Sequence, residues 1–252
     1  MNNLTRLHYS RFDNAIWKIH KILDKNQLCV ETRNKNTQEI TLNFIGADRK
    51  IVLESIIFPW HTNIEAVYEN LIICSIYDDV QLPKPSRYLF FDIENKKILL
   101  ELSKINRISF FRNGIEYYDK LNICYCIDNK CNTFNKSQFA ELEIDFEQTF
   151  FTTQQGLYFE EFKTMIEELN LPTPYQNIQY LEIKDSLVFS YDFLDAKDIK
   201  YKIVIVESDK SLSLNFDILK NNQGLVDNTY FIFQNSVLFL GDEQTLCTYK
   251  LY

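Results

Sequence analysis

Residues 58–65, FPWHTNIE, combine side chains that could do chemistry in a short irregular stretch. Trp60 is one of two tryptophans in the chain, His61 is one of three histidines, and Glu65 adds a carboxylate. Histidine can act as a general acid or base near neutral pH, and an indole ring can stack on a ligand. A loop whose tryptophan folds back onto a strand edge explains the same residues, and the sequence favours that interpretation.

Residues 77–87, YDDVQLPKPSR, form a second candidate region with clear loop composition. Asp78 and Asp79 are adjacent, so they would point in opposite directions on a strand, and only a turn could aim both at one cation. Long loops often carry function, although prolines that stiffen a solvated loop are the simpler interpretation. The predicted binding contacts of the chain are Trp60, His61, Asp78, Asp79 and Arg87.

Cys124, Cys126 and Cys131 follow the spacing C-x-C-x4-C. The first two would share a face of a strand, and Cys131 could return across the turn that follows. A zinc ion usually takes four ligands, and the histidines His8, His20 and His61 are all distant in sequence. We therefore expect structural cysteines, no metal and no cofactor. Free, buried thiols are also expected for the cysteines that lie inside apolar strands, namely Cys29, Cys74, Cys124, Cys126 and Cys247.

Composition and motifs exclude several classes of protein. The chain has only five glycines and no P-loop, Gly-x-Gly-x-x-Gly, Gly-x-Ser-x-Gly or His-Glu-x-x-His pattern, which argues against phosphate cradles and serine-hydrolase elbows. A net charge of −8 argues against nucleic acid and against an anionic membrane surface as partners. Residues 1–17 lack the apolar core of a signal peptide, and no apolar run is long enough to span a bilayer, so we expect a cytoplasmic protein.

The elements that would position these residues are mostly hairpins. Residues 28–44, 88–102 and 238–251 each place an apolar strand on both sides of a short polar turn, which is typical of antiparallel pairs. One interruption, residues 155–170, carries apolar residues at helical spacing and glutamates on the other face, which predicts an amphipathic helix near 156–170 that ends before Pro172. The helix is expected to pack its apolar stripe on a sheet rather than to bind a partner.

The strand count favours a closed all-β architecture. We expect about 19 to 20 strands, and four strands per blade would give about five blades in a β-propeller-like ring. The linker at the helix is short and both sides share one pattern, so residues 1–252 are expected to form a single domain. A β-sandwich-like assembly of two sheets is the alternative.

A family resemblance supports the ring. Residues 88–102 and 237–251 resemble the outer strand pairs of quinoprotein-type or WD40-type propeller blades, and the hairpin that ends at Tyr252 resembles a closing blade. The Gly-His and Trp-Asp pairs of WD40 repeats and the glycine-rich turns of kelch repeats are absent from the sequence. The chain also resembles small bacterial families with a described fold and no assigned activity, so the resemblance transfers no catalytic residue.

Two functions follow from these observations. The first is a non-catalytic scaffold of the β-propeller type that binds a protein or a small ligand at the loop face of the ring. The alternative is a hydrolase or lyase with an acid–base pair at the central channel, formed by His61 and an aspartate such as Asp78.

Overall fold

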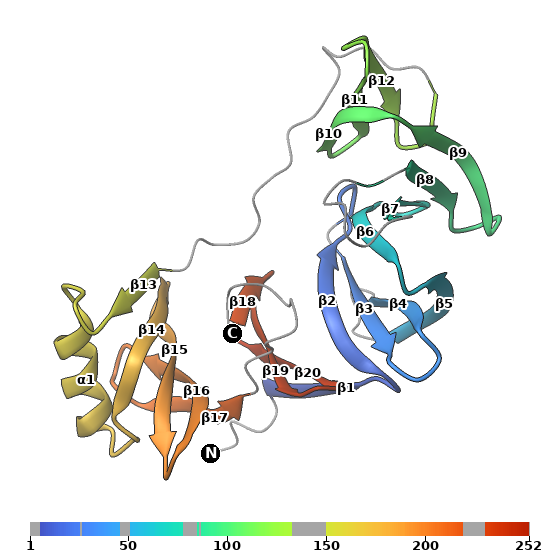
Figure 1. Ribbon diagram of the computed structural model, residues 1–252. Helices are drawn as coiled ribbons and strands as arrows, with labels where there is room; N and C mark the ends of the chain where they lie inside the picture. Colours follow the sequence, from blue (N-terminus) through green and yellow to red (C-terminus); the bar gives the residue numbers. More distant parts are fainter. Residues whose placement is uncertain are drawn as a thin grey trace. The chain divides into compact units, whose positions relative to one another are not determined.

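The computed structural model describes residues 6–25, 27–45, 51–77, 85, 87–132, 150–218 and 230–251 (Figure 1). Within these residues the chain forms twenty β-strands and one α-helix. The strands belong to five antiparallel sheets of three to five strands. The chain divides into two compact units, one made of Asn14–Glu143 and the other of Met1–Asp13 together with Ile144–Tyr252.

The unit Asn14–Glu143 contains three sheets in which each strand pairs with the next along the chain. The first sheet consists of β2 (Ala15–Lys21), β3 (Leu28–Asn34), β4 (Glu39–Ile45) and β5 (Ile51–Pro59). The second consists of β6 (Thr62–Val67), β7 (Leu71–Ile76), β8 (Arg87–Asp92) and β9 (Lys97–Ser103). The third consists of β10 (Ile105–Phe111), β11 (Gly114–Asp119) and β12 (Cys124–Asp128).

Strand β7 shows how the sequence builds the cores of this unit. Successive side chains on a strand point to opposite faces of the sheet. Accordingly Ile72 and Cys74 join a core with residues of β3, β4 and β5, whereas Leu71 and Ile73 join another with Ile115 of β11. Strand β7 is therefore buried on both faces, which explains why it reads LIICSI, a nearly continuous apolar run.

The other unit contains a five-stranded sheet, a four-stranded sheet and the helix. The five-stranded sheet consists of β13 (Phe150–Thr153), β14 (Pro174–Ile183), β15 (Ser186–Asp195), β16 (Asp198–Glu207) and β17 (Leu212–Ile218). The helix α1 (Phe159–Glu168) lies between β13 and β14 in sequence. The four-stranded sheet has the order β1 (Leu7–Arg11), β20 (Thr245–Lys250), β19 (Ser236–Asp242) and β18 (Tyr230–Phe233), so it combines strands from both ends of the chain.

Helix α1 covers one face of the five-stranded sheet. In β16, Val204 packs in a core with Phe159 and Ile166 of the helix, whereas Ile203 packs on the opposite face with residues of β19 and β20. Figure 1 shows α1 beside β14. The sheet is thus a middle layer between the helix on one side and the four-stranded sheet on the other.

The structure confirms several expectations and corrects one. The chain is mostly β with a single described helix, which occupies Phe159–Glu168 within the predicted range and packs its apolar stripe on a sheet. The described strands form five sheets, whereas the β-sandwich alternative has two sheets. Burial was wrongly expected for Cys124, which is exposed because it projects from the face of β12 opposite to Ile127, the residue of this strand that joins a core.

No helix among the described residues is long and apolar enough to cross a membrane. The cytoplasmic location and the single domain stay predictions.

Candidate functional site

Trp60 and His61 form the turn that connects β5 of the first sheet to β6 of the second. The ring of Trp60 lies 6.3 Å from the ring of Trp17, centroid to centroid, at an interplanar angle of 58°. The guanidinium group of Arg33 stacks on both, 4.5 Å from the Trp17 centroid and 5.4 Å from that of Trp60. Both tryptophans of the chain therefore contact one arginine, a favourable cation–π arrangement. His61 is exposed.

Arg33 also holds the backbone of this turn. Its Nη1 donates to the carbonyl oxygen of Trp60 at 3.5 Å, and its Nη2 donates to that of Thr62 at 3.4 Å. Its Nε donates to Oε1 of Glu31 at 2.7 Å. We call His20, Glu31, Arg33 and the two tryptophans the Arg33 cluster. The cluster fixes the path of the chain from one sheet to the next.

The ionisation of the Arg33 cluster follows from its burial. Glu31 is fully buried, and Nε2 of His20 lies 2.9 Å from Oε2 of Glu31. Burial lowers the pKa of His20 and outweighs the attraction of Glu31, so the imidazole is neutral at pH 7 and donates from Nε2. Burial alone would raise the pKa of Glu31, but the hydrogen bond from His20 and the charge of Arg33 hold it below its usual value.

A histidine hydrogen-bonded to a carboxylate is a familiar catalytic pair, but here it serves the fold. His20 is 7% exposed and Glu31 is 0% exposed, so neither group reaches a substrate in solution. The negative charge of Glu31 is balanced by Arg33, whose other donors bind backbone carbonyls. We therefore assign the Arg33 cluster to stability rather than to acid–base chemistry.

The pairing register brings His61 and Arg87 to one end of the second sheet. Thr62 of β6 pairs with Ile76 of β7, and Ile76 pairs with Arg87 of β8. The turn that carries His61 therefore enters the sheet at the end where β7 stops and β8 starts, which we call the Arg87 end. Nη1 of Arg87 also lies 3.2 Å from Oε1 of Glu101 in an exposed ion pair.

Asp78 and Asp79, which follow β7, lie outside the described residues. A binding role for Trp60, His61, Asp78, Asp79 and Arg87 stays a prediction, as does an acid–base pair of His61 and Asp78.

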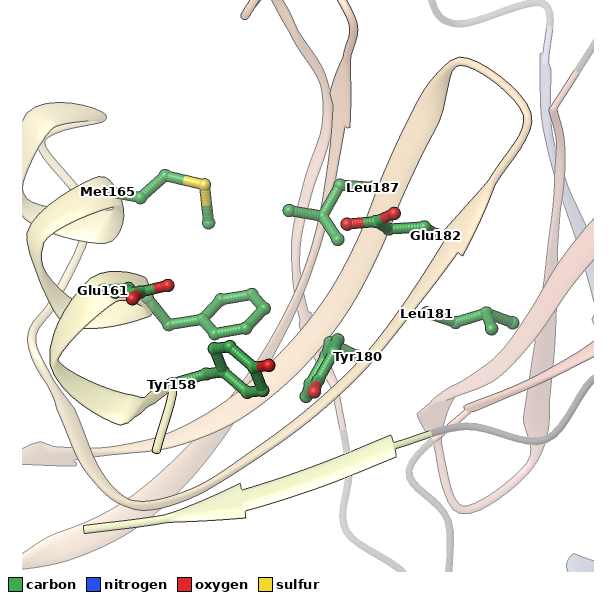
Figure 2. Close-up of a pocket in the computed structure, with 8 residues that line it drawn as sticks. Tyr158, Glu161, Met165, Tyr180, Leu181, Glu182 and Leu187 are labelled. Carbon is green, nitrogen blue, oxygen red and sulfur yellow. The ribbon is translucent and has the colours of Figure 1, made fainter. Parts of the chain in front are cut away.

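A separate groove lies between helix α1 and strands β14 and β15 in the other unit (Figure 2). Its volume is about 640 Å³. We call it the α1 groove, and its lining consists of Tyr158, Glu161, Phe162, Met165, Tyr180, Leu181, Glu182 and Leu187. Figure 2 shows the carboxylates of Glu161 and Glu182 turned toward the space between the helix and the strand.

Aromatic contacts shape one side of the α1 groove. The ring of Phe162 lies 4.8 Å from that of Tyr180, and Tyr158 meets Tyr180 edge to face at 6.4 Å. Tyr158 remains 45% exposed and its neighbour Leu157 is 83% exposed. Burial, followed by the neighbouring Tyr158, raises the pKa of Tyr180, so its phenol stays protonated and can donate a hydrogen bond. The groove therefore combines an apolar wall, a phenol donor and two carboxylates.

Sequence reasoning found the helix but not the groove. The periodicity of Tyr158, Phe162 and Met165 was correctly interpreted as an apolar stripe, yet only Phe159 and Ile166 of the helix are fully covered. The available signal was the width of the stripe, which exceeds what two buried positions require. No local signal could have identified Arg33 as the partner of Trp60, because 27 residues separate them.

Comparisons with known proteins add little to this geometry. No protein-family model and no curated protein matches the chain. Among solved structures, Hsv2 of Kluyvelomyces marxianus is similar at 8% identity and a TM-score of 0.32, over 95% of this chain and 73% of that one. BamB of Moraxella catarrhalis is similar at 6% identity and a TM-score of 0.30, over 94% of this chain and 84% of that one.

A third similar structure is KlAtg21 in complex with the coiled coil of AgAtg16, at 10% identity and a TM-score of 0.26, over 90% of this chain and 67% of that one. The similar structures are β-propeller or WD40-like proteins. At these TM-scores the likeness does not establish a common fold.

Proposed function

We propose that the chain is a non-catalytic scaffold that binds a basic amphipathic segment of a partner protein in the α1 groove. The groove carries this proposal because it is open, apolar on its aromatic wall and acidic at Glu161 and Glu182. Its volume of about 640 Å³ lies within the usual range of binding pockets, roughly 300–1,000 Å³. Aromatic and methionine side chains are enriched in the centres of protein interfaces.

Charge complementarity indicates a basic partner. Helix α1 has glutamates in its first turn and no basic residue in its last turn. Glu167 and Glu168 stand in that last turn, where the helix dipole disfavours negative charge. Lysine or arginine side chains of a bound segment would neutralise both this repulsion and the two carboxylates of the groove. The net charge of −8 adds a long-range attraction for such a segment.

The β-propeller arrangement belongs to the same proposal. The five described sheets are antiparallel, and cores lie between neighbouring sheets within each unit. The pairing of β1 with β20 completes a sheet from both ends of the chain, as closure of a ring of about five blades requires. A crystal structure tests this part directly, since an open arrangement of the five sheets would reject the ring and leave the groove proposal standing.

A synthetic leucine–lysine peptide with helical spacing tests the groove. We expect the full chain to bind this peptide in isothermal titration, and to bind a leucine–glutamate peptide of the same pattern at least about tenfold more weakly, which corresponds to 1.4 kcal/mol. The double variant Glu161→Lys/Glu182→Lys should reverse that preference. The matched control is Glu160→Lys, in the same first turn, because the Glu160 side chain is 77% exposed and does not line the groove. Equal binding of both peptides, or an equal effect of the control, would reject the proposal.

A further inference from the structure

Two cysteines and a glutamate meet on one face of the β10–β12 sheet. In the β11–β12 pair, Glu116 stands directly opposite Cys126. Cys124 lies two residues before Cys126, so it projects to the same face of the sheet. The Sγ atoms of the two cysteines are 4.0 Å apart, and these atoms and a carboxylate oxygen of Glu116 all lie within 4.8 Å of one another.

This separation suits a shared metal ion better than a disulfide. With Zn–S bonds of about 2.3 Å and tetrahedral angles, two thiolates on one zinc ion are about 3.8 Å apart. A disulfide needs about 2.05 Å between the sulfurs and a Cα separation below about 6.8 Å. Two residues that are two positions apart on a strand already span about 6.8 Å, so they stand at that limit. The thiols are thus close enough to share an ion and poorly placed to oxidise together.

We propose that Glu116, Cys124 and Cys126 bind a Zn²⁺ ion, with the fourth position open to water. Thiolates select soft or borderline ions, and zinc also accepts a carboxylate oxygen. Three protein ligands and one open position are the arrangement of exchangeable or reactive zinc sites rather than of closed structural sites.

The three proposed zinc ligands differ in exposure in the way that an open zinc site requires. Glu116 is 5% exposed, so its carboxylate is held in place by the sheet before an ion arrives. Cys124 is exposed and Cys126 is half-buried, which leaves a path from solvent to the sulfurs. Glu116 comes from the strand before the cysteines and is ten residues from Cys126, so a search for nearby cysteines and histidines does not find it.

Cys131 provides an internal control. It completes the C-x-C-x4-C spacing, but it packs against the core on the opposite side with Ile115 and Ile127. Burial, together with the nearby Asp128 and Asp92, raises the pKa of its thiol to about 11, so it offers no thiolate near neutral pH. The structure therefore divides three cysteines that look equivalent in sequence into two ligands and one core residue.

Titration of the reduced, chelator-treated full chain with Co²⁺, followed by displacement with Zn²⁺, tests the site. We expect one equivalent of Co²⁺ to produce thiolate-to-metal charge-transfer absorption that Zn²⁺ abolishes. Cys124→Ser and Cys126→Ser should each weaken Zn²⁺ binding beyond the roughly 10–100-fold that loss of a mere supporting group causes. Glu116→Gln should weaken binding and shift the d–d bands, whereas Cys131→Ser should leave affinity and spectrum unchanged.

Several outcomes would overturn the site. They are no charge-transfer absorption in the unmodified chain, unchanged affinity in Cys124→Ser, or an equal loss in Cys131→Ser. Unchanged affinity in Glu116→Gln would remove the carboxylate from the ligand set. Circular dichroism melts identify variants that fail to fold, and Cys124→Ser is decisive in that case because its side chain is exposed and its replacement leaves no cavity.

Discussion

The Arg33 cluster and the α1 groove both combine aromatic and charged side chains, but the two arrangements serve different purposes. In the Arg33 cluster the charged group lies against two aromatic rings, and its donors bind Glu31 and backbone carbonyls of the same unit. In the α1 groove the aromatic rings contact one another, and the charged groups stand beside them with their carboxylates directed into open space.

The two regions differ in whether the charged group is paired within the fold or only by a bound ligand. A buried charge that is paired internally belongs to the fold, because removal of one partner leaves the other buried and uncompensated. A charge beside an open apolar surface costs little while solvated, and it gains a partner only when a ligand arrives. Aromatic and charged residues near each other in sequence therefore do not identify a binding site. What distinguishes a binding site is whether the charged group is paired within the fold or directed toward solvent.

Arg33→Ala should produce the largest loss of stability. The substitution leaves the carboxylate of Glu31 buried without its cation, which costs about 3–5 kcal/mol. Tryptophan fluorescence during urea unfolding measures the effect where it occurs, because both tryptophans stack on Arg33. The double variant Arg33→Ala/Glu31→Gln should lose less than the sum of the two single variants. Strict additivity would show that the two side chains are not coupled.

Ile166→Ala should produce the next largest effect. Ile166 is 0% exposed in the core between α1 and the five-stranded sheet, so its truncation costs about 2–5 kcal/mol. Loosening the helix should also abolish binding of the leucine–lysine peptide. Thr164→Ala, on an exposed position of the same helix, should stay within about 0.5 kcal/mol. Peptide binding that survives Ile166→Ala would separate the ligand from the α1 groove.

Acid should destabilise the chain through His20. Its folded pKa lies below the unfolded value of 6.5, so below pH 6.5 the unfolded chain takes up a proton that the folded chain does not. Stability should therefore fall with a slope of at most about 1.4 kcal/mol per pH unit. Glu31 extends the loss to lower pH, because its folded pKa is also depressed and its contribution disappears as the pH falls through that value.

The variant His20→Gln tests this pH dependence. Glutamine can still donate a hydrogen bond to Glu31 but does not titrate, so the slope of unfolding free energy between pH 6.5 and about 5 should decrease. Equal slopes in His20→Gln and the unmodified chain would contradict the assignment of a neutral buried imidazole.

Tyr158→Ser should have the smallest effect on stability, within about 0.5–1 kcal/mol, because the side chain is 45% exposed. Affinity for the leucine–lysine peptide should nevertheless fall by about tenfold or more, since aromatic side chains in interfaces often contribute over 1 kcal/mol. Trp60→Phe should behave in the reverse manner, with a stability loss of about 0.5–2 kcal/mol from the weakened cation–π contact and unchanged peptide affinity. If the two variants lost stability and peptide affinity to the same extent, the distinction between the Arg33 cluster and the α1 groove would be wrong.

Local sequence patterns predicted the elements well because their causes are local. The hairpins at 28–44, 88–102 and 238–251 all appear, as β3–β4, β8–β9 and β19–β20, since apolar strands around a polar turn encode both the strands and their direct pairing. The helix appears because its apolar spacing is local as well. The pairing of β1 with β20 could not be predicted, because it depends on contacts between opposite ends of the chain.

The candidate sites were harder to predict for the same reason. His61 and Arg87 share one end of a sheet through the register of β6, β7 and β8, which no short pattern specifies. The contrast between Cys124 and Cys131 depends on which face of the sheet meets a core, and the groove depends on how far α1 lies from β14. Each of these is a property of packing between elements rather than of any single element.

The sheet β1–β20–β19–β18 combines strands from both ends of the chain, which has a consequence for the order of folding. Arg11 pairs with Thr245, so β1 leaves the ribosome roughly 230 residues before its partner strand, a delay of about 10–50 s at ordinary rates of synthesis. The unit Asn14–Glu143 is continuous and lies wholly within that interval. This unit can therefore fold during translation while β1 is still an unpaired, exposed strand. A molecular chaperone that shields residues 7–11 would act during this interval.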